Sequence, residues 1–175
     1  MSARLTLIAA VSADGRISKG TGVPWDLPAD REHFRAYARD RWLLIGRRTH
    51  EEMLGWFQPG HHPLVLTRDA SFQAMLGQPV PTVARALELA SQADQAELVC
   101  CGGAQTYAAA MPLADSLVIT HVHDFLGDGP IFPTIAAETW EPVSRRKHEV
   151  DAQHAVSFEI VRYQRVCWAP LDLAA

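Results

Sequence analysis

Two short segments of the sequence each place glycine between an apolar run and a helix-like run. They are residues 44–49 (Leu-Ile-Gly-Arg-Arg-Thr) and residues 99–106 (Val-Cys-Cys-Gly-Gly-Ala-Gln-Thr). Glycine at such a point lets a ligand approach the backbone, and the free N–H groups and dipole of the following helix attract an anion. Arg47 and Arg48 add formal charge at the first segment only. Two such segments suggest a dinucleotide, although either one could simply end a strand.

Neither segment has the sequence of a common phosphate loop. No Gly-Lys-Ser/Thr occurs in the chain, and the Rossmann glycine fingerprint is missing after the first apolar run. A kinase and an ordinary dehydrogenase are therefore disfavoured.

A third segment, residues 22–34, combines a tryptophan, two prolines and several acids, of which Asp30 is the most informative. If Pro28 begins a helix, Asp30 lies in its first turn and Phe34 lies one turn later on the same face. Such a carboxylate is commonly solvated and stabilised by the helix dipole. Beside Phe34 and Trp25 it would instead be desolvated with a raised pKa, able to hold a cationic or amidine-like ligand and to assist proton transfer.

The elements that must position these residues follow from hydrophobic patterning. Near-continuous apolar runs predict strands that are covered on both faces, and hence parallel. These runs occupy residues 5–11, 42–45, 64–67, 97–101 and 117–122. Helices are predicted at residues 28–40, 49–54, 83–93 and 104–111. Residues 141–150 and 154–165 predict an antiparallel pair joined by a tight turn at 151–153, so the fold class is α/β with a mixed sheet.

Composition limits the remaining possibilities. A chain of 175 residues predicts one domain, and 48% apolar with 21% charged residues is ordinary globular composition. The formal net charge of −4 argues against binding to nucleic acid or to an anionic membrane by bulk electrostatics. The first 85 residues hold eleven basic and eight acidic side chains, so an anionic ligand is expected in that half.

Cysteine usage and hydropathy predict a cytoplasmic protein without a membrane segment. Three cysteines are too few for a disulfide framework, and the longest uncharged run contains glycines and a proline. Residues 4–13 could imitate a short signal peptide, but they fit better as a buried strand that turns at Asp14-Gly15.

Six motifs together resemble the dihydrofolate reductase family, and the resemblance runs from about Leu5 to Arg165. They occur in the family's order, at nearly the family's spacing. The motifs are Leu7-Ile-Ala-Ala10, Pro24-Trp25-x-Leu27-Pro28-x-Asp30 with Phe34, Gly46-Arg47-x-Thr49, Cys101-Gly102-Gly103 with Tyr107, Thr120-His121, and Gly127-Asp128 followed by Phe132-Pro133.

The resemblance implies an α/β fold: a single domain over residues 1–167 with a mostly parallel eight-stranded sheet, antiparallel C-terminal strands and about four flanking helices. Residues 168–175 would form a C-terminal tail. The implied reaction is the NADPH-dependent reduction of 7,8-dihydrofolate to 5,6,7,8-tetrahydrofolate, with NADPH as cofactor, in tetrahydrofolate biosynthesis and one-carbon metabolism. The expected protein is a monomer that binds a small-molecule substrate.

The resemblance also implies roles for individual residues. Asp30 would grip the pterin's 2-amino and N3 edge, supported by Thr120, and Trp25 would help order a water. The substrate pocket would be lined by Ile8, Ala10, Asp30, Arg31, Phe34, Met53 and Thr120. The cofactor would contact Ala10, Ile17, Gly46, Arg47, Arg48, Thr49, Thr67, Arg68, Gly102, Gly103, Ala104, Gln105 and Tyr107. The loop from Ser12 to Val23 would close over the nicotinamide.

One departure from the family pattern concerns the substrate's glutamate tail. The family usually follows its Pro-Gly turn with an arginine that binds the tail carboxylate, whereas this chain has His61 there. An imidazole cannot reproduce a bidentate pair, so the preference for glutamylated folate is open, and Arg31 or Arg35 could supply the missing charge. His121 and His123 share a predicted strand face, but two ligands do not make a metal site, and no metal is expected.

Three other functions stay open at this point. The first is a reductase of the same fold acting on a ribosylated pyrimidine in riboflavin synthesis, suggested by residues 12–17, although that branch generally lacks the Pro-Trp-x-Leu-Pro-x-Asp segment. The second is the reduction of another pteridine. The third is a folate- or NADP-binding module without turnover, which the lost arginine would permit but Asp30, Trp25 and Thr120 argue against.

Overall fold

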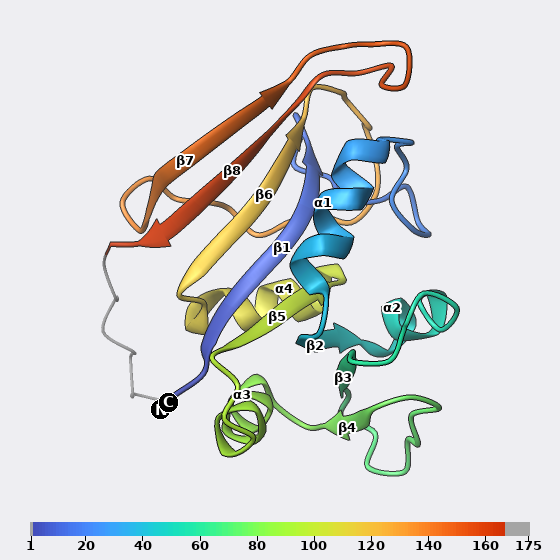
Figure 1. The fold of residues 1–175 in the computed structure, drawn as a ribbon, viewed down its shortest axis with the longest axis vertical. Helices are drawn as coiled ribbons and strands as arrows, with labels where there is room; N and C mark the ends of the chain where they lie inside the picture. Colours follow the sequence, from blue (N-terminus) through green and yellow to red (C-terminus); the bar gives the residue numbers. More distant parts are fainter. Residues whose placement is uncertain (1, 167–175) are drawn as a thin grey trace.

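The computed structural model describes residues 2–166, which form one eight-stranded sheet with helices on both faces (Figure 1). The strands are β1 (Arg4–Ser12), β2 (Trp42–Gly46), β3 (His62–Leu66), β4 (Gln78–Val80), β5 (Glu97–Gly102), β6 (Ser116–Val122), β7 (Trp140–His148) and β8 (Phe158–Arg165). The helices are α1 (Pro28–Ala38), α2 (Arg47–Glu52), α3 (Val83–Gln92), α4 (Ala104–Ala110) and the 3₁₀ turn η1 (Met111–Leu113). The predicted tail, residues 168–175, lies outside the described residues.

The sheet is mostly parallel, in the order β4-β3-β2-β5-β1-β6-β8-β7. The pairs from β4 to β6 are parallel, and β8 runs antiparallel to both β6 and β7. This confirms the predicted fold class. Because β1 pairs with β5 on one side and β6 on the other, it lies at the centre of the sheet, which explains its apolar sequence.

Hydrophobic cores lie on the two faces of the sheet. On one face, side chains of α3 and α4 such as Val83 and Ala110 pack on β1 through Leu7. On the other face, α1 packs through Phe34 and Ala38, and in Figure 1 it lies in front of β1. Successive residues of a strand point to opposite faces, so Leu7 contributes to the first core and Ile8 to the second.

Some predicted boundaries were wrong. The last strand begins at Phe158 rather than at residue 154, and residues 149–157 form a loop whose narrow part is closed by a bridge between Asp151 and His154. Helix α1 ends at Ala38, because Arg39 is extended and Asp40 has a positive φ of 55°. Strand β4 was missed, since it is short and contains a proline. No helix among residues 2–166 is long and apolar enough to cross a membrane.

Tyr107 of α4 contacts both β1 and β5 at the point where the pairing of these two strands ends. Their pairing ends at Leu7 and Cys100, and the Tyr107 hydroxyl donates a hydrogen bond of 2.6 Å to the next carbonyl on β1, that of Ile8. Burial raises the pKa of Tyr107 well above its usual value, so the hydroxyl keeps its proton and remains a donor. The tyrosine ring leaves no room for a side chain on Gly102, whose φ is +102° and whose added Cβ would lie 2.7 Å from the ring.

Replacing Tyr107 with phenylalanine should therefore destabilise the protein by about 1–3 kcal/mol, because the buried Ile8 carbonyl loses its donor. Urea unfolding monitored by tryptophan fluorescence measures this change. Tyr163→Phe is the matched control, since its hydroxyl pairs with His121 in a half-buried setting and should cost about 1 kcal/mol or less. Equal effects of the two substitutions would contradict the importance of the Ile8 contact.

Candidate active site

A cleft of about 1390 Å³ runs along the carboxyl ends of the parallel strands. Its wall includes Ala10 near the end of β1, Gly46 at the end of β2, Leu66 at the end of β3 and Thr120 of β6. In open α/β sheets this edge is where ligands bind, because the connecting loops and helix starts gather there.

The cleft brings together nearly all the residues singled out in the sequence. Those expected at the substrate are Ile8, Ala10, Trp25, Asp30, Arg31, Phe34, Met53 and Thr120, and all of them line it. Those expected at the cofactor that line it are Ala10, Ile17, Gly46, Arg47, Arg48, Thr49, Thr67, Arg68, Gly103, Ala104, Gln105 and Tyr107. Gly102 is the exception, because it is buried against the Tyr107 ring rather than facing the cleft.

Asp30 is held where α1 meets the sheet. Its Oδ1 accepts a hydrogen bond of 2.5 Å from the hydroxyl of Thr120, and Thr120 is the partner of Ala10 in the β1–β6 register. Burial raises the pKa of Asp30, against the opposing effects of the Thr120 hydrogen bond and of nearby His33. The site therefore contains a desolvated carboxyl group that holds a proton at higher pH than a surface aspartate.

Trp25 makes a hydrogen bond outside the immediate surroundings of Asp30. Its indole N–H donates a hydrogen bond of 2.8 Å to the carboxylate of Asp124, in the segment that follows β6. The ring of Trp25 packs with the core beneath α1. The expected role of Trp25 in ordering a water stays a prediction.

The two glycine segments lie against each other, as expected of strand ends that are neighbours in the sheet. A Cβ on Gly46 would lie 2.7 Å from the hydroxyl of Thr106, and a Cβ on Gly103 would lie 3.3 Å from the hydroxyl of Thr49. Glycine is therefore required at Gly46, and the backbones of α2 and α4 begin side by side at the cleft. Their N–H groups suit an elongated ligand with two linked phosphates.

Three arginines line the cleft at this end. Arg47 pairs with Glu51 and Asp69 at 3.8 and 3.5 Å, and Arg48 pairs with Glu52 at 3.5 Å. All these pairs are solvent-exposed and therefore weak, so a phosphate can displace them. Arg68, also exposed, has no ion pair with another described residue. These three arginines follow β2 and β3, whereas Asp30 and Arg31 line the cleft from α1.

Arg31 and His61 lie differently with respect to the cleft. Arg31 lines it and pairs with exposed Asp26 at 3.0 Å. His61 does not line it: its ring stacks on Trp56 at 4.6 Å and its Nδ1 accepts the Gln58 N–H. Burial lowers the pKa of His61, which favours the neutral ring. Arg35 is exposed and does not line the cleft, so Arg31 is the better placed of the two arginines; its proposed compensation stays a prediction.

The sequence analysis missed two side chains of the substrate end. His33 lies one turn after Asp30, and its Nε2 is buried without a hydrogen-bond partner among residues 2–166. Its spacing from Asp30 could have indicated a shared helix face. Trp56 packs against Phe34 with the two rings tilted and their centroids 5.2 Å apart, but it lies in a turn after α2 where no periodic pattern points to it.

The loop after β1 is anchored to the loop after β6. The carboxylate of Asp14 accepts N–H groups from Leu126 and Gly127 at 3.0 and 2.8 Å, and the Ile17 N–H donates to the Pro130 carbonyl. Hydrogen bonds, chiefly from Ser12, lower the pKa of Asp14 to about 2. These contacts hold Ile17 on the cleft wall, as the expected covering role of this loop requires.

The buried carboxyl of Asp30 should reduce stability at neutral pH. Its folded pKa lies above the ordinary value of 3.8, so the stability that it contributes falls as pH rises from that value through the folded pKa. Asp30→Asn keeps an acceptor for the Thr120 hydroxyl but removes the buried charge. We expect the variant to have the higher free energy of unfolding at pH 7, with a smaller difference near pH 4.

Urea unfolding at the two pH values measures this, with exposed Asp26→Asn as the control that should change little. A variant less stable than wild type at pH 7 would contradict the desolvation of Asp30.

Comparisons with known proteins identify the family of this chain. The family model for dihydrofolate reductase matches residues 4–165. The chain is 33% identical to dihydrofolate reductase type 3 of Salmonella typhimurium over 92% of this chain and 98% of that one, and 33% identical to dihydrofolate reductase of Neisseria meningitidis serogroup A over 93% and 98%. A solved dihydrofolate reductase from Enterococcus faecalis, complexed with NADP(H) and RAB-propyl, superposes with a TM-score of 0.82 at 28% identity, covering 94% of this chain and 97% of that one. The chain therefore belongs to the dihydrofolate reductase family.

Proposed function

We propose that this chain carries out its family's reaction, the NADPH-dependent reduction of 7,8-dihydrofolate to 5,6,7,8-tetrahydrofolate, with Asp30 as its acidic group. One observation carries the assignment of Asp30: a desolvated carboxyl, bonded to Thr120, stands at one end of a cleft whose other end is basic. The family match over residues 4–165 supports the reaction itself.

At the substrate end, Asp30 would bind the 2-amino and N3 edge of the pterin, which presents donors in an amidine-like arrangement. Thr120 fixes the carboxylate by donating to its Oδ1. Ile8, Phe34 and Met53 line the cleft nearby and would enclose the flat ring. Because burial raises the pKa of Asp30, this group holds its proton to higher pH than a surface aspartate and would assist proton delivery to N5 of the substrate.

At the cofactor end, the residues present suit NADPH. The crowded glycine at Gly46 and the adjacent starts of α2 and α4 offer backbone N–H groups to the pyrophosphate. Arg48 and Arg68 would hold the 2′-phosphate, while Ala10 and Ile17 would contact the nicotinamide ring. NADPH supplies the hydride when bound, so the chain's own contribution is to hold the two rings against each other and to exclude water.

The alternative functions gain less support. The curated relatives named above are dihydrofolate reductases, and the chain keeps the Pro-Trp-x-Leu-Pro-x-Asp segment, which argues against a pyrimidine reductase. A binding module without turnover is disfavoured because these relatives are named as reductases.

We also propose a cytoplasmic monomer that does not bind nucleic acid. A net charge of −4 supports the absence of nucleic-acid binding, and an odd, small number of cysteines supports the cytoplasm. The monomer is an expectation from the family resemblance.

Replacing Asp30 with asparagine should retain NADPH binding and lower dihydrofolate turnover by about 10²–10⁴, the usual contribution of an acid–base group. Steady-state oxidation of NADPH measures turnover, and fluorescence titration measures cofactor binding. The wild-type hydride step should slow as pH rises through the pKa of Asp30. Exposed Glu32→Gln, on the same helix, is the control and should behave as wild type. Wild-type turnover by Asp30→Asn at neutral pH would contradict the assignment of Asp30 as the acidic group.

The chain should prefer NADPH over NADH by at least about tenfold, because a charge-assisted hydrogen bond to the 2′-phosphate contributes about 1.5–3 kcal/mol before screening. The double replacement Arg48→Ala and Arg68→Ala should reduce this preference by raising the KM for NADPH alone. Arg162→Ala, an exposed arginine on β8, should leave both cofactors unaffected. Equal use of NADH and NADPH by the wild type would contradict this placement of the arginines.

A further inference from the structure

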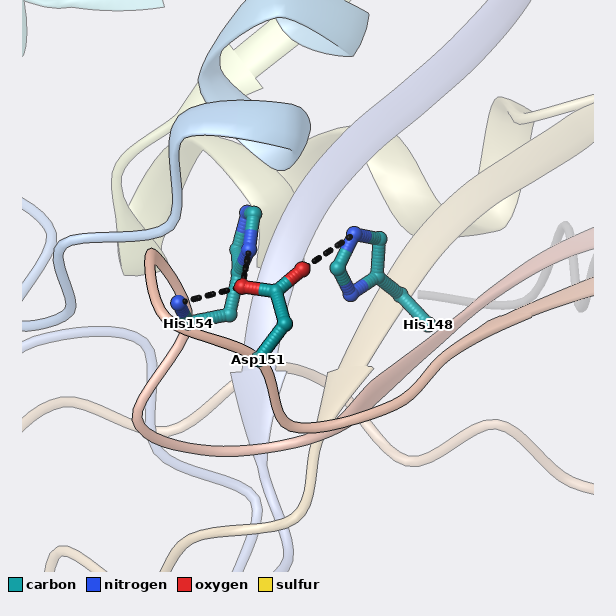
Figure 2. Close-up of side chains that lie close together, drawn as sticks. All are labelled: His148, Asp151 and His154. Atoms are coloured by element: carbon teal, nitrogen blue, oxygen red, sulfur yellow. Dashed lines mark hydrogen bonds and ion pairs between the residues drawn. The ribbon is translucent and has the colours of Figure 1, made fainter.

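A cluster of three polar side chains occupies the end of the β7–β8 hairpin, outside the cleft. Ligand atoms of His148, Asp151 and His154 lie within 4.8 Å of one another, and Figure 2 shows both imidazole rings beside the carboxylate. Such a set has the chemistry of a metal site. The hydrogen bonds of His154 point to a different use.

Both ring nitrogens of His154 already have partners. Nδ1 lies 2.7 Å from Oδ1 of Asp151, and Nε2 lies 3.1 Å from the backbone nitrogen of Ala29. An ionised carboxylate only accepts, so Nδ1 carries the hydrogen, and Nε2 is left as the acceptor for the Ala29 N–H. A metal on Nδ1 would move the hydrogen to Nε2, where it would face the Ala29 N–H. Binding a metal and bonding to Ala29 are therefore mutually exclusive for this neutral ring.

The bond to Ala29 falls at the start of α1, where the helix has no local cap. The N-cap residue Leu27 has no side-chain acceptor, and Pro28 has no N–H. The first N–H that needs a partner is thus that of Ala29, and His154 reaches it from 125 residues away in the sequence. Figure 1 shows the hairpin end approaching the start of α1. Asp30 is the next residue of the helix.

The cap is itself held firmly. His154 is 3% exposed, and its ring lies against Phe158 and His148, with centroids 5.8 and 4.1 Å away. Asp151 also accepts the backbone N–H groups of Gln153 and His154, at 2.8 and 2.9 Å, which closes the turn. These contacts fix the conformation of the loop, and they fix the orientation and the tautomer of the His154 imidazole.

We propose that Asp151 and His154 form a positioning pair that caps α1 and so sets the place of Asp30 against Thr120. The proposal rests on the proposed role of Asp30 in the reaction. The 2.5 Å bond between Asp30 and Thr120 joins the first turn of α1 to β6, so it requires that turn to stay wound and in place. An unbonded Ala29 N–H would let the turn fray, and Asp30 would move with it.

The test compares two replacements of His154. Phenylalanine keeps a flat ring but removes the acceptor, whereas glutamine can place its amide oxygen near the position of Nε2. For His154→Phe we expect kcat to fall by about tenfold or more, since small displacements of reacting groups are costly, while the KM for NADPH stays unchanged. The amide hydrogens of Ala29 and Asp30 should exchange at least about tenfold faster by NMR, with other helices unaffected. His154→Gln should restore most of both properties.

Two further variants guard the interpretation. Asp151→Ala replaces a more exposed residue, so the fold should tolerate it. Because the carboxylate no longer fixes the tautomer of His154, kcat should fall and amide exchange should rise, both by less than in His154→Phe. His123→Phe is the control, because His123 bonds to Ser157 of the same loop and has no hydrogen bond to α1 within residues 2–166. This variant should leave kcat and amide exchange unchanged.

Three results would overturn the proposal: unchanged exchange at Ala29 in His154→Phe, faster exchange with an unchanged kcat, or failure of His154→Gln to restore either property. If wild-type protein does not reduce dihydrofolate, the proposed function fails instead, and the amide exchange still tests the cap.

Discussion

The site depends on keeping one carboxyl group out of water at a junction between a helix and a sheet. Desolvation of Asp30 is unfavourable for its charged form, and the Thr120 hydroxyl and nearby His33 offset part of that cost. The compensation works only if β6 and α1 keep a fixed distance. The central position of β1 between β5 and β6, and the apolar packing beneath α1, are what fix this distance.

The sequence was informative about what local patterns determine. Buried parallel strands need apolar residues on both faces, so the central strands were identified by composition alone. The site edge followed from topology, because the carboxyl ends of parallel strands share one side of the sheet, and Gly46 and Gly103 had to lie there. Pro28 likewise indicated where α1 begins, and therefore placed Asp30 in its first turn.

Features that depend on contacts between distant residues left no local signal. No residue near His154 in the sequence indicates that its ring accepts a hydrogen bond from Ala29. Likewise, no residue near Trp25 indicates that its indole N–H donates to Asp124. Residues 154–157 have the composition of a strand, yet the turn bonded through Asp151 takes them out of the β8 pairing. Short elements suffer similarly: β4 exists because it pairs with β3, and not because its own sequence favours a strand.

The separation of charge along the cleft has a consequence for how two ligands bind together. Arg47, Arg48 and Arg68 line the cleft from α2 and from the segment after β3, whereas Asp30, with Arg31 beside it, lines the cleft from α1. A phosphate-bearing molecule is therefore favoured at the first group, and a ring with an amidine-like edge is favoured at Asp30. Exchanging their places would set phosphate beside a buried carboxyl group and would leave the arginines without an anion. Two like charges close together in a low-dielectric site repel strongly. The charges of the cleft therefore favour one placement of the two ligands over the reverse placement. In the function proposed above, the reacting rings would meet near Ala10 and Ile17, two apolar residues that line the cleft.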